Sequence, residues 1–239
     1  MSATILLADV GNSRVKLCAA GLQGLVFFDW RTATGREALR RDLKQRNPTR
    51  IVVASTSPQA DSKLKEKVWS PFCVQQIGAA DLPLQVLTAG SGIDRLLAAW
   101  WLFEQQQAPL LIADCGTAFT LDVVDAQGRF QGGAIGAGLG LQEQALATAC
   151  PHLAAPVVES DAIPRCTAGA VSRGTRGALA VAISGLADAF EQEIGVRCVR
   201  FLSGGDAQRL AALLPGWKRR DDLVLEALDY FVSQQRYEA

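Results

Sequence analysis

The sequence predicts an α/β protein built from two similar lobes, and three observations lead to this prediction. Short apolar strands alternate with amphipathic helices along the 239 residues. An apolar strand that ends in Asp-x-Gly occurs twice, and a Gly-Gly turn follows a third strand near the C-terminus. Finally, 105 residues separate Asp9 from Asp114 in the two Asp-x-Gly segments, which is about the length of a domain.

The first half of the chain begins with a predicted β-hairpin. Apolar runs at 4–8 and 15–20 flank the polar turn Gly11-Asn12-Ser13, which is typical of two strands joined by a tight turn. After the hairpin we expect a helix at 35–46, a buried strand at 50–54, a helix near 60–69 and a helix at 93–107. The last of these has Leu96, Leu97, Trp100 and Phe103 at helical spacing.

The second half repeats the opening of the first. A buried strand at 110–114 leads into a second predicted hairpin. Beyond it the pattern predicts helices at 139–149 and 169–194, a strand at 197–202, a turn at 203–206, and helices at 207–214 and 221–235.

The two hairpin openings are similar residue by residue. Leu6-Leu7-Ala8-Asp9-Val10-Gly11-Asn12-Ser13 is echoed by Leu111-Ile112-Ala113-Asp114-Cys115-Gly116-Thr117-Ala118. Duplication of an α/β lobe explains this echo better than coincidence, and it predicts two lobes that face each other across a cleft. The segment Gln105-Gln106-Gln107-Ala108-Pro109 breaks the preceding helix. We therefore predict lobes at 1–108 and 109–239.

Composition excludes several classes of function. The 24 basic and 24 acidic residues balance, so no strong field favours nucleic acid or an anionic membrane as a partner. The longest apolar run, 96–103, is too short to cross a bilayer, and the N-terminus lacks the basic region of a signal peptide. The six cysteines form no C-x-x-C pair, so we expect free, buried thiols in a reducing compartment. The expected location is the cytoplasm.

The motifs that remain are glycine-rich turns of the kind that bind phosphate. Backbone N–H groups and close approach make such turns suitable for phosphate groups. The sequence contains neither a G-x-x-x-x-G-K-[ST] loop nor a strand-to-helix G-x-G-x-x-G, which argues against a P-loop enzyme or a dinucleotide fold. What it offers instead are the turns at Asp9 and Asp114 and the segment Ser203-Gly204-Gly205-Asp206-Ala207.

These three turns, in this order, resemble the actin-like (ribonuclease H-like) fold of sugar kinases, heat-shock chaperones and actin. A narrower resemblance, to type III pantothenate kinase, rests on five segments that span residues 6 to about 210. They are Asp9-Val10-Gly11-Asn12-Ser13-Arg14-Val15-Lys16, Gly92-Ile93-Asp94-Arg95, Asp114-Cys115-Gly116-Thr117-Ala118-Phe119-Thr120, Gly132-Gly133-Ala134-Ile135 and Ser203-Gly204-Gly205-Asp206-Ala207.

The resemblance implies a role for each matching residue in phosphorylating pantothenate with ATP. Asp94 would be the general base, and Gly92, Ile93, Arg95 and Thr167 would bind pantothenate, Thr167 from a partner subunit. Asp9 would lie near Mg²⁺, and Asp114 at a site for K⁺ or NH₄⁺. The implied ATP-binding residues are Asp9, Gly11, Asn12, Ser13, Lys16, Thr117, Gly204 and Gly205. A homodimer that makes 4′-phosphopantothenate for coenzyme A synthesis is implied by the same resemblance.

Two departures from the family pattern leave the acceptor less certain than the nucleotide. Ala137 stands where the family usually has a proline, and Gln85-Val86-Leu87-Thr88 replaces a stretch that usually holds a tyrosine. Two other hypotheses therefore stay open: a nucleotide-binding regulator of the same fold with weak catalysis, and an actin-like kinase for another small hydroxylated acceptor.

Several of these residues also have purely structural interpretations. Asp94 and Arg95 suit the start of a helix, where an acidic side chain is favoured by the helix dipole. Lys16 suits a solvated strand edge, and Trp100-Trp101 suit either the core or a pocket wall. The glycine-rich run 132–140 is either adjacent to phosphate or a tight junction between strand and helix. His152, the single histidine, suits a surface or packing role.

Overall fold

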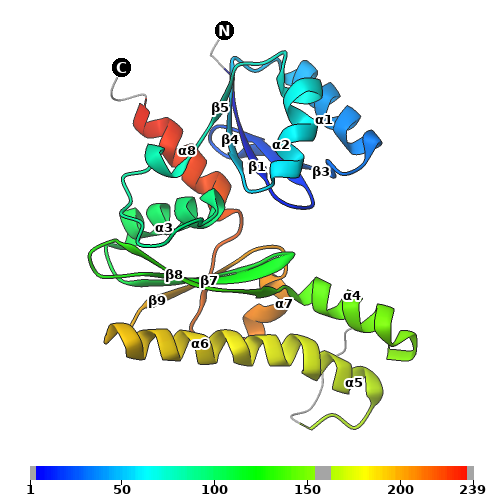
Figure 1. Ribbon diagram of the computed structural model, residues 1–239, viewed down its shortest axis with the longest axis vertical. Coiled ribbons are helices and arrows are strands. Elements are labelled where there is room, and N and C mark those ends of the chain that lie inside the picture. Colours follow the sequence, from blue (N-terminus) through cyan, green and yellow to red (C-terminus); the bar gives the residue numbers. More distant parts are fainter. Residues whose placement is uncertain (1–3, 154–162, 236–239) are drawn as a thin grey trace. The chain divides into compact units, whose positions relative to one another are not determined.

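The computed structural model describes residues 4–153 and 163–235, and its contacts divide the chain into two compact units. The first unit comprises Met1–Gln85, Ala89–Gln105 and Asp222–Ala239, and the second comprises Val86–Thr88 and Gln106–Asp221. Figure 1 shows the helices and strands of both units and labels most of them.

The first unit contains a mixed five-stranded sheet in the order β3-β2-β1-β4-β5. β1 pairs antiparallel with β2, which pairs antiparallel with β3, whereas β4 and β5 continue parallel to β1. The hairpin predicted from the first Asp-x-Gly segment is confirmed. The strands are β1 (Ile5–Val10), β2 (Val15–Ala19), β3 (Gln23–Phe28), β4 (Arg50–Ser55) and β5 (Val74–Gln76).

The second unit repeats this sheet strand for strand. Its order is β10-β9-β6-β7-β8, with β6 antiparallel to β7, β7 antiparallel to β8, and β9 and β10 parallel to β6. β6 thus corresponds to β1, and Asp114 to Asp9, each one residue before the end of its strand. The strands are β6 (Leu110–Cys115), β7 (Ala118–Val124), β8 (Phe130–Ala137), β9 (Val199–Ser203) and β10 (Lys218–Arg219). The predicted pair of similar α/β lobes is therefore confirmed at the level of topology.

Helices bury the apolar faces of the first sheet. Leu39 and Leu43 of α1 enter a core with Leu6, Leu17 and Ile51 of the strands. The C-terminal helix α8 also packs against β1 and β4, although it begins 213 residues after the end of β1 and 168 after the end of β4. The helices of this unit are α1 (Ala33–Arg46), α2 (Pro58–Leu64) with the π-helical η1 (Lys65–Trp69), the 3₁₀ turn η2 (Ala79–Asp81), α3 (Ile93–Gln106) and α8 (Leu223–Gln235).

In the second unit a long helix lies along the sheet (Figure 1). Leu179, Ile183 and Ala187 of this helix, α6, join Leu111 and Leu121 in the core. The helix predicted at 169–194 is observed as α5 (Thr167–Ser172), a π-helical turn η4 (Arg173–Gly177) and α6 (Ala178–Ile194). The other helices are α4 (Leu139–Ala149), η3 (Pro151–Leu153), α7 (Ala207–Leu210) and η5 (Ala211–Leu213).

Four strands were not predicted: β3, β5, β8 and β10. β8 was not predicted because it contains several glycines, which are uncommon in strands. A Cβ at Gly133 would lie 1.8 Å from the carbonyl oxygen of Leu121, and one at Gly136 would lie 2.3 Å from the Phe119 ring. At these two glycines β8 therefore approaches β7 too closely for the β-branched side chains by which strands are usually recognised.

Candidate functional site

In the first unit the β1–β2 turn brings Asp9 and Lys16 opposite each other. The two residues are direct partners in the antiparallel register, and Lys16 Nζ lies 3.9 Å from Asp9 Oδ2. The Gly11 amide donates to the Arg14 carbonyl at 3.1 Å and closes the turn, whose tip holds Asn12 and Ser13. An acid and a base therefore stand together at the carboxyl end of β1.

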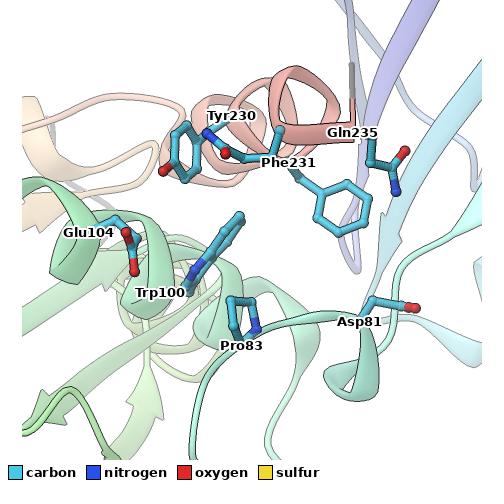
Figure 2. A pocket seen from close by; sticks show the side chains of 8 residues that line it. Asp81, Pro83, Trp100, Glu104, Tyr230, Phe231 and Gln235 are labelled. Atoms are coloured by element: carbon cyan, nitrogen blue, oxygen red, sulfur yellow. The ribbon is translucent and has the colours of Figure 1, made fainter. Parts of the chain in front are cut away.

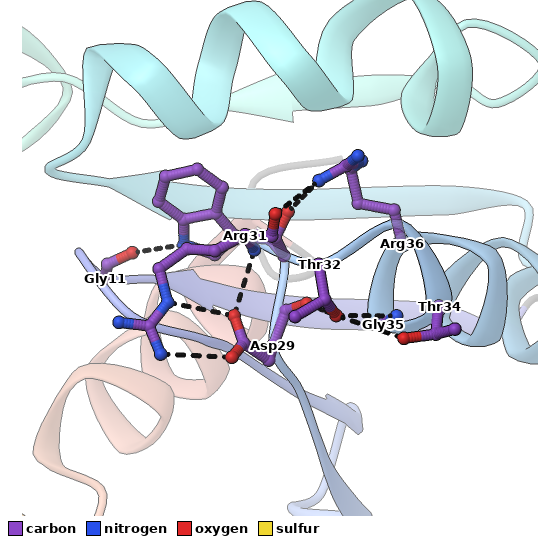
Figure 3. Close-up of polar contacts among 8 residues, drawn as sticks. Gly11, Asp29, Arg31, Thr32, Thr34, Gly35 and Arg36 are labelled. Atoms are coloured by element: carbon purple, nitrogen blue, oxygen red, sulfur yellow. Dashed lines mark hydrogen bonds and ion pairs between the residues drawn. The ribbon is translucent and has the colours of Figure 1, made fainter.

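A buried tryptophan forms a hydrogen bond with the backbone of this turn. Trp30 is 2% exposed, and its indole Nε1 donates to the Gly11 carbonyl at 2.8 Å (Figure 3). Arg36 of α1 in turn donates to the Trp30 carbonyl at 2.7 Å. Figure 3 also shows the Asp29–Arg31 ion pair on the same loop. Trp30 was not among the predicted site residues, because an isolated tryptophan after a strand gives no signal of its partner.

Lys16 has a second acidic partner that the sequence did not reveal. Asp222 Oδ1 lies 2.7 Å from Lys16 Nζ, and both side chains are partly buried. Asp222 immediately precedes α8 and has a positive φ of 56°. Because 206 residues separate the two, only the packing of α8 on the first sheet creates this contact. The structure thus does not support a freely solvated Lys16.

Asp94 lies in the first turn of α3, beside the ends of β1 and β4. A Cβ at Gly92 would lie 2.6 Å from Asp94 Oδ1 and 3.3 Å from Thr56 Cγ2. Thr56 follows β4, and its amide donates to the Val10 carbonyl at 3.1 Å. The segment that carries Asp94 and the turn that carries Asp9 therefore meet at the same edge of the first sheet. Ile93 is buried, and Arg95 is half-buried.

The environment of Asp94 favours its protonated form. Burial raises the pKa of Asp94 above its ordinary value of 3.8, although a hydrogen bond from the Arg95 amide at 2.8 Å and the Arg95 charge oppose the shift. A carboxylate that is partly desolvated in this way binds a proton more strongly than one in water. Such a group is suited to accept a proton from a substrate hydroxyl.

In the second unit three glycine-containing turns pack against one another. A Cβ at Gly204, whose φ is +92°, would lie 2.4 Å from Asp114 Oδ1 and 2.5 Å from the Cys115 carbonyl oxygen. A Cβ at Gly138 would lie 2.0 Å from the Gly116 carbonyl oxygen. The Asp206 amide also donates to the Cys115 carbonyl at 2.8 Å. The predicted residues Asp114, Thr117, Gly204 and Gly205 thus lie on turns that are in contact.

The carboxylates of Asp114 and Asp206 place negative charge beside these packed turns. Burial raises the pKa of the Cys115 thiol to about 12, and the nearby charges of Asp114 and Asp206 add to the effect. Arg209 forms ion pairs with Asp206 and with Glu143 of α4. Asp206 and Arg209 were not among the predicted site residues. Glu143, the partner of Arg209 on α4, lies 66 residues earlier in the chain, so no local pattern indicates this contact.

The glycine-rich run at 132–140 proves to be mainly the strand β8 and its junction with α4. Gly138 is the N-cap of α4, and its amide donates to the Thr117 carbonyl at 3.0 Å. The junction therefore lies directly against the Asp114–Thr117 turn. The tight strand-to-helix junction is observed, and its position next to phosphate stays a prediction.

Thr167 occupies a different part of the second unit. It is the first residue of α5 and is exposed, and α5 packs against η3 beyond the end of α4. His152 in η3 is exposed as well, which agrees with the surface role predicted for it.

The six cysteines are free, as predicted, but they are not all buried. Cys18 and Cys115 are buried, whereas the expectation of burial is wrong for Cys73 and Cys166, which are exposed. Both of these lie on loops at the edges of elements, where apolar neighbours in the sequence do not ensure burial. Trp100 is buried, as its helical spacing predicted.

Two general properties of the described ranges bear on function. In residues 4–153 and 163–235 no three His, Cys, Asp or Glu side chains gather as a ready-made metal-binding group. Over the same residues, none of the helices combines the length and the apolar character needed to span a bilayer.

Comparison with known sequences identifies one family. The sequence model of the type III pantothenate kinase family matches residues 5–189. The type III pantothenate kinase of Halorhodospira halophila is 32% identical over 248 residues, covering 93% of this chain and 95% of the relative. That of Laribacter hongkongensis is 32% identical over 234 residues, covering 94% of this chain and 96% of the relative.

Comparison with solved structures identifies the fold. A conserved putative Baf family transcriptional activator from Campylobacter jejuni aligns with a TM-score of 0.71 at 19% identity, covering 97% of this chain and 99% of that chain. An archaeal actin homolog aligns with a TM-score of 0.53 at 12% identity, covering 98% and 99%. At these identities the likeness concerns the fold alone, and that fold is actin-like, as the order of the three turns predicted.

Proposed function

This chain belongs to the type III pantothenate kinase family, and we propose that it transfers the γ-phosphoryl group of ATP to the hydroxyl of pantothenate. The product would be 4′-phosphopantothenate, for coenzyme A synthesis. The observation that carries the proposal is the position of Asp94, a carboxylate of raised pKa at the same sheet edge as the Asp9–Lys16 turn. Phosphoryl transfer depends on positioning and charge neutralisation, and these residue types are suited to both.

Residues of both units would bind ATP. In the first unit, the amides of Asn12 and Ser13 would hold phosphate oxygens, Gly11 would let the phosphates approach the turn closely, and Lys16 would neutralise their charge. In the second unit, Thr117, Gly204 and Gly205 would contact ATP from the turns that pack around Asp114. The location that we propose is the cytoplasm.

The donor atoms present fit the cations that the family uses. Asp9 offers a hard carboxylate oxygen, and Mg²⁺ in kinases is typically held by one or two carboxylates together with phosphate oxygens. At Asp114, a carboxylate oxygen and the Cys115 carbonyl oxygen lie close together beside Gly204. Such oxygen donors suit K⁺ or NH₄⁺. When bound, these cations would supply charge neutralisation for the phosphate groups.

Asp94 would act on the acceptor. Its carboxylate would accept the proton of the pantothenate hydroxyl as the oxygen attacks the γ-phosphorus. Gly92, Ile93 and Arg95 would bind pantothenate around it. Arg95 is suited to pair with a carboxylate through its planar guanidinium. Thr167 of the partner subunit would complete the pocket in a homodimer.

The test is ATP-dependent phosphorylation of pantothenate by the purified protein, with and without K⁺, detected by mass spectrometry of the product. Asp94→Asn should lower kcat by roughly 10²–10⁴-fold. Asp61→Asn is the matched control, because Asp61 also lies in the first turn of a helix, α2, and loses the same interaction with the helix dipole.

Equal activity of the two variants would refute the role of Asp94 as the base. ATP binding without phosphorylation of pantothenate would refute the substrate assignment. A panel of other small hydroxylated acceptors would then separate a kinase of different specificity from a nucleotide-binding regulator.

A further inference from the structure

The first unit contains a pocket that none of the motifs discussed above explains. Its volume is about 400 Å³, and it opens between the loop before α3, the second half of α3 and the end of α8 (Figure 2). All of its lining residues belong to the first unit. They are Asp81, Pro83, Trp100, Glu104, Tyr230, Phe231, Gln234 and Gln235.

Three aromatic rings form the wall of this pocket. Trp100 is 5% exposed and Phe231 8%, and their ring centroids are 6.3 Å apart in an edge-to-face arrangement. The Tyr230 ring lies 5.2 Å from that of Trp100, tilted by 43°. Figure 2 shows Tyr230 and Phe231 on α8, across from Trp100. Faces of aromatic rings carry partial negative charge and attract cations.

The charged side chains of the pocket are acidic. Asp81 and Glu104 contribute carboxylates at its exposed edge, and Gln234 and Gln235 contribute amides. Among the described residues that line it, none is Lys, Arg or His. Aromatic faces with carboxylates at the rim form a surface that favours a positively charged ligand over a neutral or anionic one.

One buried donor in this wall has no acceptor. The indole Nε1 of Trp100 is buried and donates no hydrogen bond among the described residues. The neighbouring Trp101 differs, because its Nε1 donates to Glu226 Oε2 at 3.1 Å. An unpaired buried N–H group costs free energy, so it calls for an acceptor that the protein itself does not provide. A ligand oxygen in the pocket would supply it.

We propose that this pocket binds a small organic ammonium ion that also carries an oxygen acceptor, of the amino-alcohol class that includes choline. The ammonium group would lie against the faces of Trp100 and Tyr230, with Glu104 and Asp81 balancing its charge. The oxygen of the ligand would accept from Trp100 Nε1. A bare metal ion would use the carboxylates but would leave both the rings and the indole N–H without a partner.

The experiment compares choline with 3,3-dimethylbutan-1-ol, a neutral molecule of the same shape, in titrations of the full chain. Binding is followed by the ¹⁵N resonances of the five tryptophan indoles. We expect choline to shift the Trp100 resonance and to bind at least about tenfold more tightly than the neutral alcohol. Trp100→Phe identifies the resonance by its loss.

Two variants test the assignment of the ligand to this pocket. Tyr230→Leu and Glu104→Gln should each weaken choline binding about 3- to 30-fold, because each removes one attraction for the cation. Glu66→Gln, a change to an acidic residue of η1 outside the pocket, should leave binding unchanged.

Equal binding of choline and the neutral alcohol, or no binding of either, overturns the proposal. So does choline binding that Tyr230→Leu and Glu104→Gln leave intact while both variants keep the thermal stability of the parent protein. Because pantothenate kinase activity does not enter the measurement, its outcome is independent of the proposed function.

Discussion

Lys16 Nζ lies 2.7 Å from Asp222 Oδ1 and 3.9 Å from Asp9 Oδ2, so one lysine joins the β1–β2 turn to the residue that precedes α8. This contact connects the first strand of the chain with its last helix. If Lys16 binds ATP phosphates, Asp222 is the residue that holds it near them before the nucleotide arrives.

Substitutions of Lys16 and Asp222 should distinguish the binding of ATP phosphates by Lys16 from the positioning of Lys16 by Asp222. Lys16→Ala removes a hydrogen bond to a charged group, worth about 1.5–3 kcal/mol, and should raise the KM for ATP by at least about tenfold. Asp222→Asn removes a half-exposed partner worth about 1 kcal/mol, so it should raise this KM by about fivefold. Initial rates at varied ATP provide the measurement. An unchanged KM in Asp222→Asn would show that Asp222 does not position the lysine.

Asp94 should be costly for stability and necessary for activity. Because burial raises its pKa in the folded protein, the folded state binds this proton more tightly than the unfolded chain does. Ionisation at neutral pH is therefore destabilising, and this penalty disappears as the pH falls through the raised pKa. Asp94→Asn should keep or raise the melting temperature at pH 7 while kcat falls.

The same shift predicts the pH dependence of catalysis. Activity should be lost as the pH falls, with the acidic limb of kcat/KM centred above 3.8, the ordinary pKa of an aspartate. A profile of initial rates against pH measures this limb. A limb at or below 3.8 would be inconsistent with Asp94 as the base.

Gly11 and Gly204 should respond differently to alanine. A Cβ at Gly204 would collide with Asp114 and Cys115 at positive φ, so Gly204→Ala should destabilise the protein by about 2–5 kcal/mol. A Cβ at Gly11 would meet nothing closer than 3.8 Å, so Gly11→Ala should change stability by less than about 0.5 kcal/mol.

The substitution of Gly11 then tests phosphate binding alone. If phosphates approach the backbone at Gly11 closely, the added methyl should weaken ATP binding by about tenfold or more without unfolding the protein. Denaturant titration and calorimetric titration with ATP measure the two effects. As a control, Gly185→Ala on the exposed face of α6 should stabilise by about 0.5–1 kcal/mol, since the new methyl meets nothing within 4 Å.

The thiols should fall into two classes of reactivity. Burial raises the pKa of Cys18 to about 11 and that of Cys115 to about 12, so neither forms a thiolate readily near neutral pH. Cys73 and Cys166 are exposed and should react first with a thiol-specific reagent at pH 8. Mass spectrometry of the partly labelled native protein identifies the sites. Early labelling of Cys18 or Cys115 would contradict their burial.

Glu191 should stabilise the second unit against acid. Burial alone would raise its pKa, but hydrogen bonds from Arg200, the Cys198 amide and Arg197 lower it to about 2. The stability that Glu191 contributes is therefore present above about pH 4.5 and is lost as the pH falls toward 2. Glu191→Gln should destabilise by about 2–4 kcal/mol at pH 7, and this difference should shrink in acid unfolding experiments.

Local pattern was sufficient for a large part of the fold. The hairpin at Asp9, its repeat at Asp114, the main helices and the two similar α/β lobes follow from alternation, helical spacing and turn residues. β8 could not be predicted in this way, because Gly132, Gly133 and Gly136 have low strand propensity. These glycines are present because β7 and Thr88 lie too close to leave room for a Cβ. The short strands β5 and β10 exist because β4 and β9 present unpaired edges to them.

The candidate site residues could be predicted from short sequence motifs. These motifs are Asp9 to Lys16, Gly92 to Arg95, Asp114 to Thr117 and the Gly204–Gly205 turn. The residues that contact these motifs in the folded protein could not be predicted from the sequence. Trp30 beneath Gly11, Thr56 beside Gly92 and Asp222 on Lys16 come from segments that are distant in sequence or carry no motif. A motif indicates which chemistry a residue type can perform. The burial, pKa and hydrogen-bond partners of that residue depend on which distant segments pack around it. Only the folding of the whole chain around its hydrophobic core determines those neighbours.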